Sequence, residues 1–161
     1  MSPIRPALSP RQFLPAIFAA LGLAMTNTAL RAEVPDRDLL GEASHKVVYQ
    51  LNKADPDYIE HVLFSVGAML REYTDDIHIV VTAIGPGIHL LAENPQRPVP
   101  EALRQRAESL AMYGVEFHAC GNTMKSLGWT EMDILDFAAV VEVGASDLME
   151  LQEQGYAYIS W

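Results

Sequence analysis

Cys120 is the only thiol in this chain of 161 residues. It ends a short apolar segment, Val115 to Cys120, and is followed by Gly121, Asn122 and Thr123, which are typical of a turn that leads into a helix. A thiol in this position lies near the positive end of the helix dipole and near free N–H donors, and both favour the nucleophilic thiolate. Free cysteine is also among the residues most often buried. Two interpretations therefore remain open, a reactive thiolate and an inert core residue.

Three other positions supply groups that could act on this thiol. His118 lies two residues earlier on the same strand, so its side chain is expected on the same face as Cys120, although a histidine in mid-strand is more often a hydrogen-bonded packing residue. Asn52 and Lys53 follow an earlier strand. Lys53 is a candidate for lowering the thiol pKa or for binding an anionic sulfur species, and its simpler interpretation is a solvated loop lysine.

Gly85 and Gly87 flank Pro86 at the end of another apolar segment. Their backbone N–H groups are candidates for binding an anion, but two glycines around a proline are primarily a turn signal. The segment lacks the glycine spacing of a dinucleotide-binding loop and the Lys-Ser/Thr ending of a P-loop, so no cofactor is predicted.

The ligand types for a metal site are poorly represented. One cysteine excludes an intrachain disulfide and a thiolate-based metal site. The five histidines show neither HxH nor HxxxH spacing, so no metal is predicted. Asp147 and Glu150 fall in the first turn of the last predicted helix, where negative charge favours the helix dipole, and nothing else in the sequence supports a catalytic role for them.

Charge and length exclude several classes of function. The chain has 11 basic and 21 acidic residues and a net charge of −10. Nucleic acid phosphates and anionic membrane surfaces need clustered Lys and Arg, so neither is a predicted partner. The length fits one domain with an extension, large enough to fold without disulfides.

The N-terminus has the pattern of a secretory signal peptide. Arg5 and Arg11 precede an uncharged stretch from Phe13 to Met25, and no acidic residue occurs before Glu33. This apolar run is shorter than the roughly 20 residues that a membrane-spanning helix needs. We predict a signal peptide over residues 1–32, cleaved at a site between Ala29 and Ala32, and a periplasmic protein with no stable membrane insertion after cleavage. A polar leader, residues 33–44, follows.

Strands and helices alternate along the rest of the chain. Apolar segments that are short and rich in β-branched residues predict strands at residues 46–51, 77–84, 115–120, 138–143 and 156–161. Helical periodicity predicts a helix after Pro56 with an apolar stripe from Ile59 to Tyr73, a helix over 100–112, a short helix capped by Asn122, and a helix that ends at Gly155. This alternation predicts a three-layer α/β domain over residues 45–161, with a mostly parallel, five-stranded sheet of flavodoxin-like architecture.

Strand order decides where a ligand binds in such a fold. Ligands bind beyond the carboxyl ends of the strands, where the winding of the sheet reverses. For the common order 2-1-3-4-5 this point lies between the first and third strands. The loops that flank it are residues 52–57 and 120–123, so the expected order places Cys120 at the default ligand site.

Four segments resemble the DsrE/DsrF-like family in the same order: VVYQLN, TAIGPGIHLL, GVEFHACGNTM and LMELQEQGYAYI. The resemblance covers nearly the whole chain from Lys46 to Trp161. It implies a small flavodoxin-like protein similar to sulfur-relay subunits, which assemble into trimers or hexamers. In some branches of the family a cysteine after the third strand carries sulfur as a persulfide, and Cys120 matches that position.

The sequence and the resemblance together predict an exported protein that binds or transfers sulfur through a persulfide on Cys120. Its partners would be a sulfur donor and an acceptor thiol, and Asn52, Lys53, Gly85, Gly87, His118, Gly121, Asn122 and Thr123 are the candidate binding residues. The alternative is a non-catalytic ligand-binding or assembly module with a buried, inert cysteine. A general thiol redox enzyme is disfavoured because no resolving cysteine is present. Tyr156, Tyr158 and Trp161 predict core or subunit-interface packing and support a homo-oligomer.

Overall fold

The computed structural model describes residues 43–161. Its strands are β1 (His45–Leu51), β2 (Ile77–Ala83), β3 (Glu116–Cys120), β4 (Ala138–Val141) and β5 (Ala157–Ile159). Its α-helices are α1 (Pro56–Tyr73), α2 (Glu101–Met112), α3 (Gly121–Leu127) and α4 (Gly144–Glu153), and three 3-10 helices are η2 (Thr74–Asp76), η3 (Gly85–Leu91) and η4 (Glu131–Asp133). The predicted signal peptide and nearly all of the predicted polar leader lie outside the described residues.

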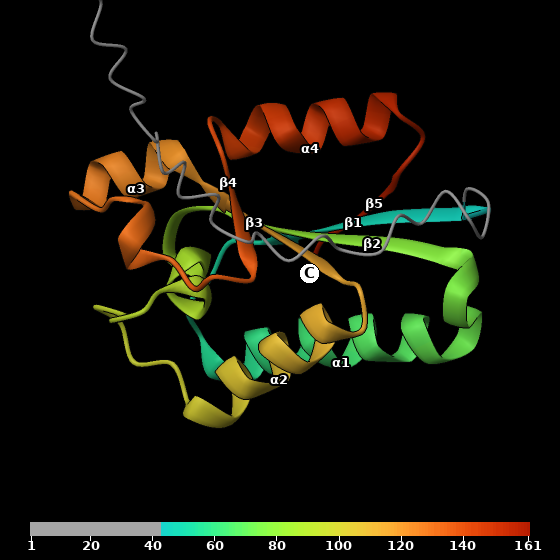
Figure 1. Ribbon diagram of the computed structural model, residues 1–161, viewed down its shortest axis with the longest axis horizontal. Coiled ribbons are helices and arrows are strands. Elements are labelled where there is room, and N and C mark those ends of the chain that lie inside the picture. Colours follow the sequence, from blue (N-terminus) through green and yellow to red (C-terminus); the bar gives the residue numbers. More distant parts are fainter. Residues whose placement is uncertain (1–42) are drawn as a thin grey trace, which may run out of the picture. The chain divides into compact units, whose positions relative to one another are not determined.

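The five strands form one parallel sheet in the order β4-β3-β2-β1-β5. Helices α1 and α2 cover one face and α4 covers the other (Figure 1). The predicted three-layer α/β architecture is therefore confirmed. No helix within residues 43–161 is long and apolar enough to cross a membrane.

The expected strand order, 2-1-3-4-5, is wrong. Strands β2, β3 and β4 are added one after another on the same side of β1, and only the last crossover, through α4, returns to the other side to place β5. The winding therefore reverses between β1 and β5, and β2 separates β1 from β3. Cys120, at the end of β3, does not lie at the switch point, so topology alone does not single it out.

The sheet face under α1 and α2 is an apolar core. Alternate strand residues point to this face, among them Tyr49 on β1, Val81 on β2 and Phe117 on β3, all of them buried. Helix α1 begins as predicted from Asp55 and Pro56, because the Asp55 carboxylate accepts the Tyr58 N–H at 2.9 Å.

The face under α4 is mixed. Val48 and Val80 pack against Leu148 and Leu151 of the helix and form a small apolar cluster. The neighbouring positions on the same strand faces are polar: His78 and Thr82 on β2, and Glu116 and His118 on β3. This face is consequently held by directional hydrogen bonds as well as by apolar contact.

One local expectation differs from the structure where β3 passes into α3. The helix begins at Gly121, with Cys120 itself in the N-cap position, so the predicted cap at Asn122 is wrong. Cys120 retains extended backbone angles, φ −69° and ψ 111°. The strand ends one residue before the helix starts, and this places the thiol directly at the junction.

Candidate functional site

Cys120 lies where two helices begin. It is the N-cap residue of α3, and the N–H of Gly144, the first residue of α4, donates a hydrogen bond to Cys120 Sγ at 3.2 Å. Only 3% of the Cys120 surface is exposed. The sulfur is therefore enclosed, and one of the groups that contacts it is a backbone donor at the start of a helix.

Two glycines make this enclosure possible. A Cβ at Gly144 would lie 2.7 Å from Cγ1 of Ile84 and 3.0 Å from the Cβ of Cys120. A Cβ at Gly121 would lie 3.0 Å from the Val141 carbonyl oxygen. All three distances are too short for an ordinary contact, so both positions need glycine for α3 and α4 to approach the sheet closely.

The hydrogen-bond donors around Sγ favour its thiolate. Burial raises the pKa of the Cys120 thiol. Hydrogen bonds with the Thr123 hydroxyl and with the backbone N–H groups of Gly144, Thr123 and Asn122 lower the pKa by a larger amount, so it lies below the ordinary value. The Thr123 hydroxyl also accepts the Gly85 N–H at 3.0 Å, which leaves its own proton free for the sulfur. A cysteine in purely apolar surroundings would show the opposite shift.

The structure gathers part of the predicted set of binding residues. Gly121, Asn122 and Thr123 adjoin Cys120, and Gly85 is linked to it through the Thr123 hydroxyl. The predicted turn around Pro86 therefore does contribute one of its glycines to this neighbourhood.

The other predicted residues at this edge lie at the end of β1, with β2 in between. Gly87 packs so closely there that a Cβ would lie 2.1 Å from the Leu51 carbonyl oxygen. The side-chain oxygen of Asn52 is buried without a hydrogen-bond partner. The Lys53 ammonium lies over the Tyr58 ring, 4.6 Å from its centre. The expectation that the Lys53 loop borders Cys120 depended on the strand order and is wrong for the same reason.

His118 shares the strand face of Cys120 but makes its bonds elsewhere. Its Nδ1 lies 2.9 and 3.0 Å from the two carboxylate oxygens of Asp147 on α4, and its Nε2 lies 3.7 Å from Oε2 of Glu116. Burial lowers the pKa of His118, but hydrogen bonds and charge interactions with these two carboxylates outweigh it and raise the pKa to about 9. His118 is consequently an imidazolium at neutral pH.

This cluster extends across the sheet in both directions. Asp147 also accepts the Thr82 hydroxyl at 2.6 Å. Glu116 contacts His78 Nε2 at 2.8 Å, and His78 Nδ1 is hydrogen bonded to the Tyr156 hydroxyl. The two histidines hold the pKa of Glu116 well below its usual range.

Sequence reasoning missed this cluster and the Gly144 donor. A signal for the cluster was present, because polar residues alternate within two strands that are otherwise apolar, IHIVVT and VEFHAC. The carboxylate that pairs with these polar residues belongs to Asp147 on α4, more than 25 residues further along the chain. Nothing in the local sequence connects Gly144 to Cys120.

The DsrE/DsrF-like family matches residues 45–161, which is more than two thirds of the chain. This chain belongs to the DsrE/DsrF-like family. The family match spans every strand and helix described above. No curated protein is similar enough to count as a relative.

Solved structures share the DsrE-like fold. A protein of unknown function, MTH1491 from Methanobacterium thermoautotrophicum, is 24% identical with a TM-score of 0.65, and the match covers 73% of this chain and 99% of that one. The ychN protein from E. coli is 13% identical with a TM-score of 0.60, covering 73% and 99%. A conserved protein of unknown function, BT1422 from Bacteroides thetaiotaomicron, is 16% identical with a TM-score of 0.57, covering 74% and 97%. At these identities the likeness establishes the fold alone.

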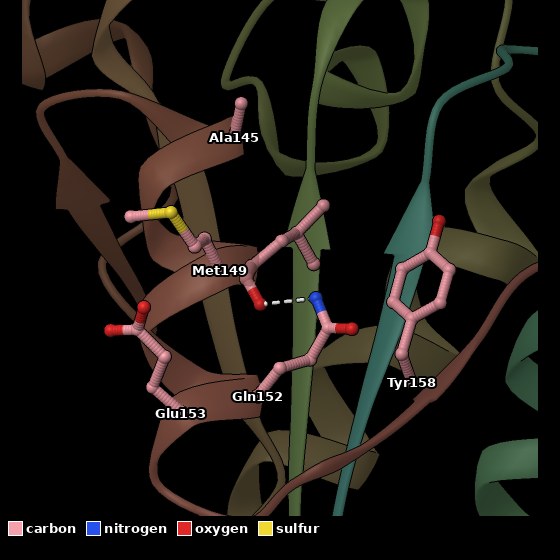
Figure 2. A pocket seen from close by; sticks show the side chains of 6 residues that line it. Ala145, Met149, Gln152, Glu153 and Tyr158 are labelled. Carbon is pink, nitrogen blue, oxygen red and sulfur yellow. Dashed lines mark hydrogen bonds between the residues drawn. The ribbon is translucent and has the colours of Figure 1, made fainter.

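A shallow groove of about 460 Å³ lies between α4 and Tyr158 of β5. Figure 2 shows Ala145, Met149, Gln152 and Glu153 along the helix, with Tyr158 of β5 opposite. Tyr158 is 42% exposed and Trp161 is 60% exposed in the single chain, so neither is a core residue of this chain. None of the predicted site residues lines this groove.

The described residues offer no group of ligands for a metal. Within residues 43–161 no three His, Cys, Asp or Glu side chains are arranged to hold a metal ion. The titratable groups beside α4 are instead paired with one another, as histidines with carboxylates.

Proposed function

We propose that this DsrE/DsrF-like protein is a sulfur carrier that accepts sulfane sulfur on Cys120 and passes it to an acceptor thiol. The hydrogen bond from Gly144 N–H to Sγ carries the proposal, because it is a donor aimed at the sulfur that stabilises a thiolate. Membership of a family related to sulfur relay supports the same chemistry.

The transfer consists of two exchanges at sulfur. The Cys120 thiolate attacks the outer sulfur of a donor persulfide, R–S–SH. A new S–S bond forms, the donor S–S bond breaks, and the donor leaves as R–S⁻ with the bonding electron pair, so that Cys120–S–SH remains. An acceptor thiolate then attacks the outer sulfur of this persulfide and releases Cys120 as the thiolate. The protein is neither oxidised nor reduced over the cycle.

The burial of Cys120 limits the donor. With 3% of the residue exposed, the sulfur is reached only by a small species or by a brief opening of the surrounding helix ends. Inorganic polysulfide is small enough to serve as the test donor. The same burial supports the alternative function, a binding or assembly module in which Cys120 is an inert packing residue.

Intact-mass spectrometry after polysulfide treatment distinguishes the two functions. For a carrier we expect mass increments of single sulfur atoms, removal of the added sulfur by dithiothreitol or cyanide, and no increment in Cys120→Ser with the fold unchanged by circular dichroism. Iodoacetamide should label Cys120 in the native protein. The carrier function is contradicted if no sulfur is added and labelling requires denaturation, and the module then replaces it.

Export and assembly form part of the same proposal. The N-terminal sequence pattern supports cleavage near Glu33 and a periplasmic location, and N-terminal analysis of the protein from the periplasmic fraction tests both. Exposed Tyr158 and Trp161, with the family resemblance, support a trimer or hexamer. Light scattering should give at least three times the mass of one mature chain, and a monomer at micromolar concentration contradicts the assembly.

A further inference from the structure

One carboxylate of helix α4, that of Asp147, is hydrogen bonded to two strands of the sheet. Asp147 receives His118 Nδ1 at 2.9 and 3.0 Å from β3 and the Thr82 hydroxyl at 2.6 Å from β2. The side chains of Asp147 and His118 are only 12% and 14% exposed. Two hydrogen-bonding groups from two neighbouring strands therefore converge on a single, largely buried side chain of the helix.

The residue that touches the thiol lies on the same helix, less than one turn away. Gly144 precedes Asp147 by three residues, so the two are separated by only about 4.5 Å along the helix axis. A helix is stiff over this distance, and a contact that fixes Asp147 also fixes the Gly144 N–H. Helix α4 also packs on this face through Leu148 and Leu151, in an apolar cluster with Val48, Val80, Ile84 and Tyr156. Apolar packing does not fix the position of a single atom as a hydrogen bond does.

We propose that Thr82, His118 and Asp147 are positioning residues that hold the Gly144 N–H against Cys120 Sγ and so keep the thiol in its reactive form. This inference rests on the proposed sulfur-carrier function and adds to it how reactivity at that site is controlled.

A stabilising role alone explains the cluster poorly. Taking ionic groups out of water costs about as much as their attraction returns, and apolar residues of similar size commonly serve stability as well. The hydrogen bonds instead fix a direction and a distance. His118 also contacts the carboxylate of Glu116, which lies on β3 and contacts His78 as well. Asp147 lies on α4, so its carboxylate is the one that connects the cluster to that helix.

The thiol pKa tests the inference. Asp147→Ala removes a negative charge near the sulfur, which lowers the thiol pKa, but it also removes a hydrogen bond that keeps His118 protonated, and loss of that positive charge raises the thiol pKa. Thr82→Val changes no charge and therefore separates position from charge. Loss of position weakens the Gly144 hydrogen bond and raises the thiol pKa. We expect Asp147→Ala to raise it by about one unit, a tenfold loss of thiolate at a pH below the pKa.

The measurement is a titration of thiolate ultraviolet absorbance in the native protein, with the matching Cys120→Ser variant subtracted as background. It does not require a reagent to reach the buried sulfur. Glu150→Ala is the control, because Glu150 is an exposed carboxylate on the same helix, and it should leave the thiol pKa unchanged.

Thr82→Val removes one hydroxyl contact without changing charge or greatly changing shape, so it is the decisive variant, and it also carries the test if Asp147→Ala fails to fold. We expect a smaller rise of the same sign. An unchanged or lowered thiol pKa in the folded variants overturns the inference.

Polysulfide loading separates this outcome from failure of the function. If the wild-type protein loads sulfur but the variants keep the wild-type thiol pKa, the positioning role is refuted and the carrier function stands. If the variants show a raised thiol pKa but the wild-type protein never loads sulfur, the carrier function is refuted and the positioning role stands.

Discussion

The two faces of the sheet are built from the same strands but differ in what holds them. Toward α1 and α2 the strands present residues such as Tyr49, Val81 and Phe117 to a continuous apolar core. Toward α4 they present a small apolar cluster, a chain of hydrogen-bonded histidines and carboxylates, and the thiol. Alternating side chains allow one strand to contribute to both faces at once.

This contrast separates stability from chemistry. Apolar contacts on the α1–α2 face are numerous and non-directional, and they contribute most of the buried apolar area. The α4 face buries less apolar surface but sets the position of individual atoms. Changes on the first face should therefore alter the free energy of unfolding without altering the thiol, whereas changes on the second should alter both.

The largest expected effect is on the apolar face. Phe117 is 1% exposed and packs edge-on against Phe137, with ring centres 5.5 Å apart. Phe117→Ala should lower the free energy of unfolding by about 3–5 kcal/mol, because it leaves a cavity in the core. Urea unfolding measures this loss. The thiol pKa should stay at its wild-type value although Phe117 neighbours His118, and a shift in that pKa would break the separation between the faces.

A pair of glycine substitutions sharpens the comparison. Gly144→Ala forces a Cβ to within 2.7 Å of Ile84, so we expect a loss of about 1–3 kcal/mol in the free energy of unfolding and a raised thiol pKa.

Gly67→Ala, on α1, is the matched control. The nearest atom to its added Cβ is the flexible Arg71 Nη1 at 3.4 Å, so we expect a gain of about 0.5–1 kcal/mol and no change at the thiol. Denaturant unfolding of both variants tests for the expected loss of stability at Gly144 and the expected gain at Gly67. Equal changes in the free energy of unfolding at the two glycines would contradict the difference between the faces.

The last expected effect is the dependence of stability on pH. The pKa of His118 is raised from 6.5 to about 9, so its contribution is fully present below pH 6.5 and is lost as the pH rises through about 9. We expect about 2 kcal/mol, less than the full shift implies, because the side chain of Glu116 is half exposed and solvent screens it.

Cys120→Ser is the background for this experiment, because a thiol with a lowered pKa stabilises the fold increasingly as the pH rises, which is the opposite pH dependence to that of His118. In that background the free energy of unfolding should fall between pH 6.5 and 9, and His118→Gln should flatten the curve. A curve unchanged by His118→Gln would show that the cluster does not stabilise the imidazolium.

Local signals were sufficient for the elements and for much of the core. The β-branched segments at β1 and β2, the Asp55-Pro56 start of α1 and the period of its apolar stripe all predict what the structure shows. These features depend on backbone preference and on burial within a few residues, which short stretches of sequence encode directly. The single thiol at a strand end before a helix was visible for the same reason.

Long-range placement is what the sequence alone did not determine. The strand order places β2 between the end of β1, where Lys53 lies, and the end of β3, where Cys120 lies. The return of the chain across the sheet through α4 places Gly144 next to the sulfur and Asp147 next to His118. A period of two shows which side chains share a face of a strand, but it carries no information about which strand lies next or which helix covers that face. Those contacts are set by the packing of the whole sheet, because only there do residues 24 or more positions apart in the chain meet.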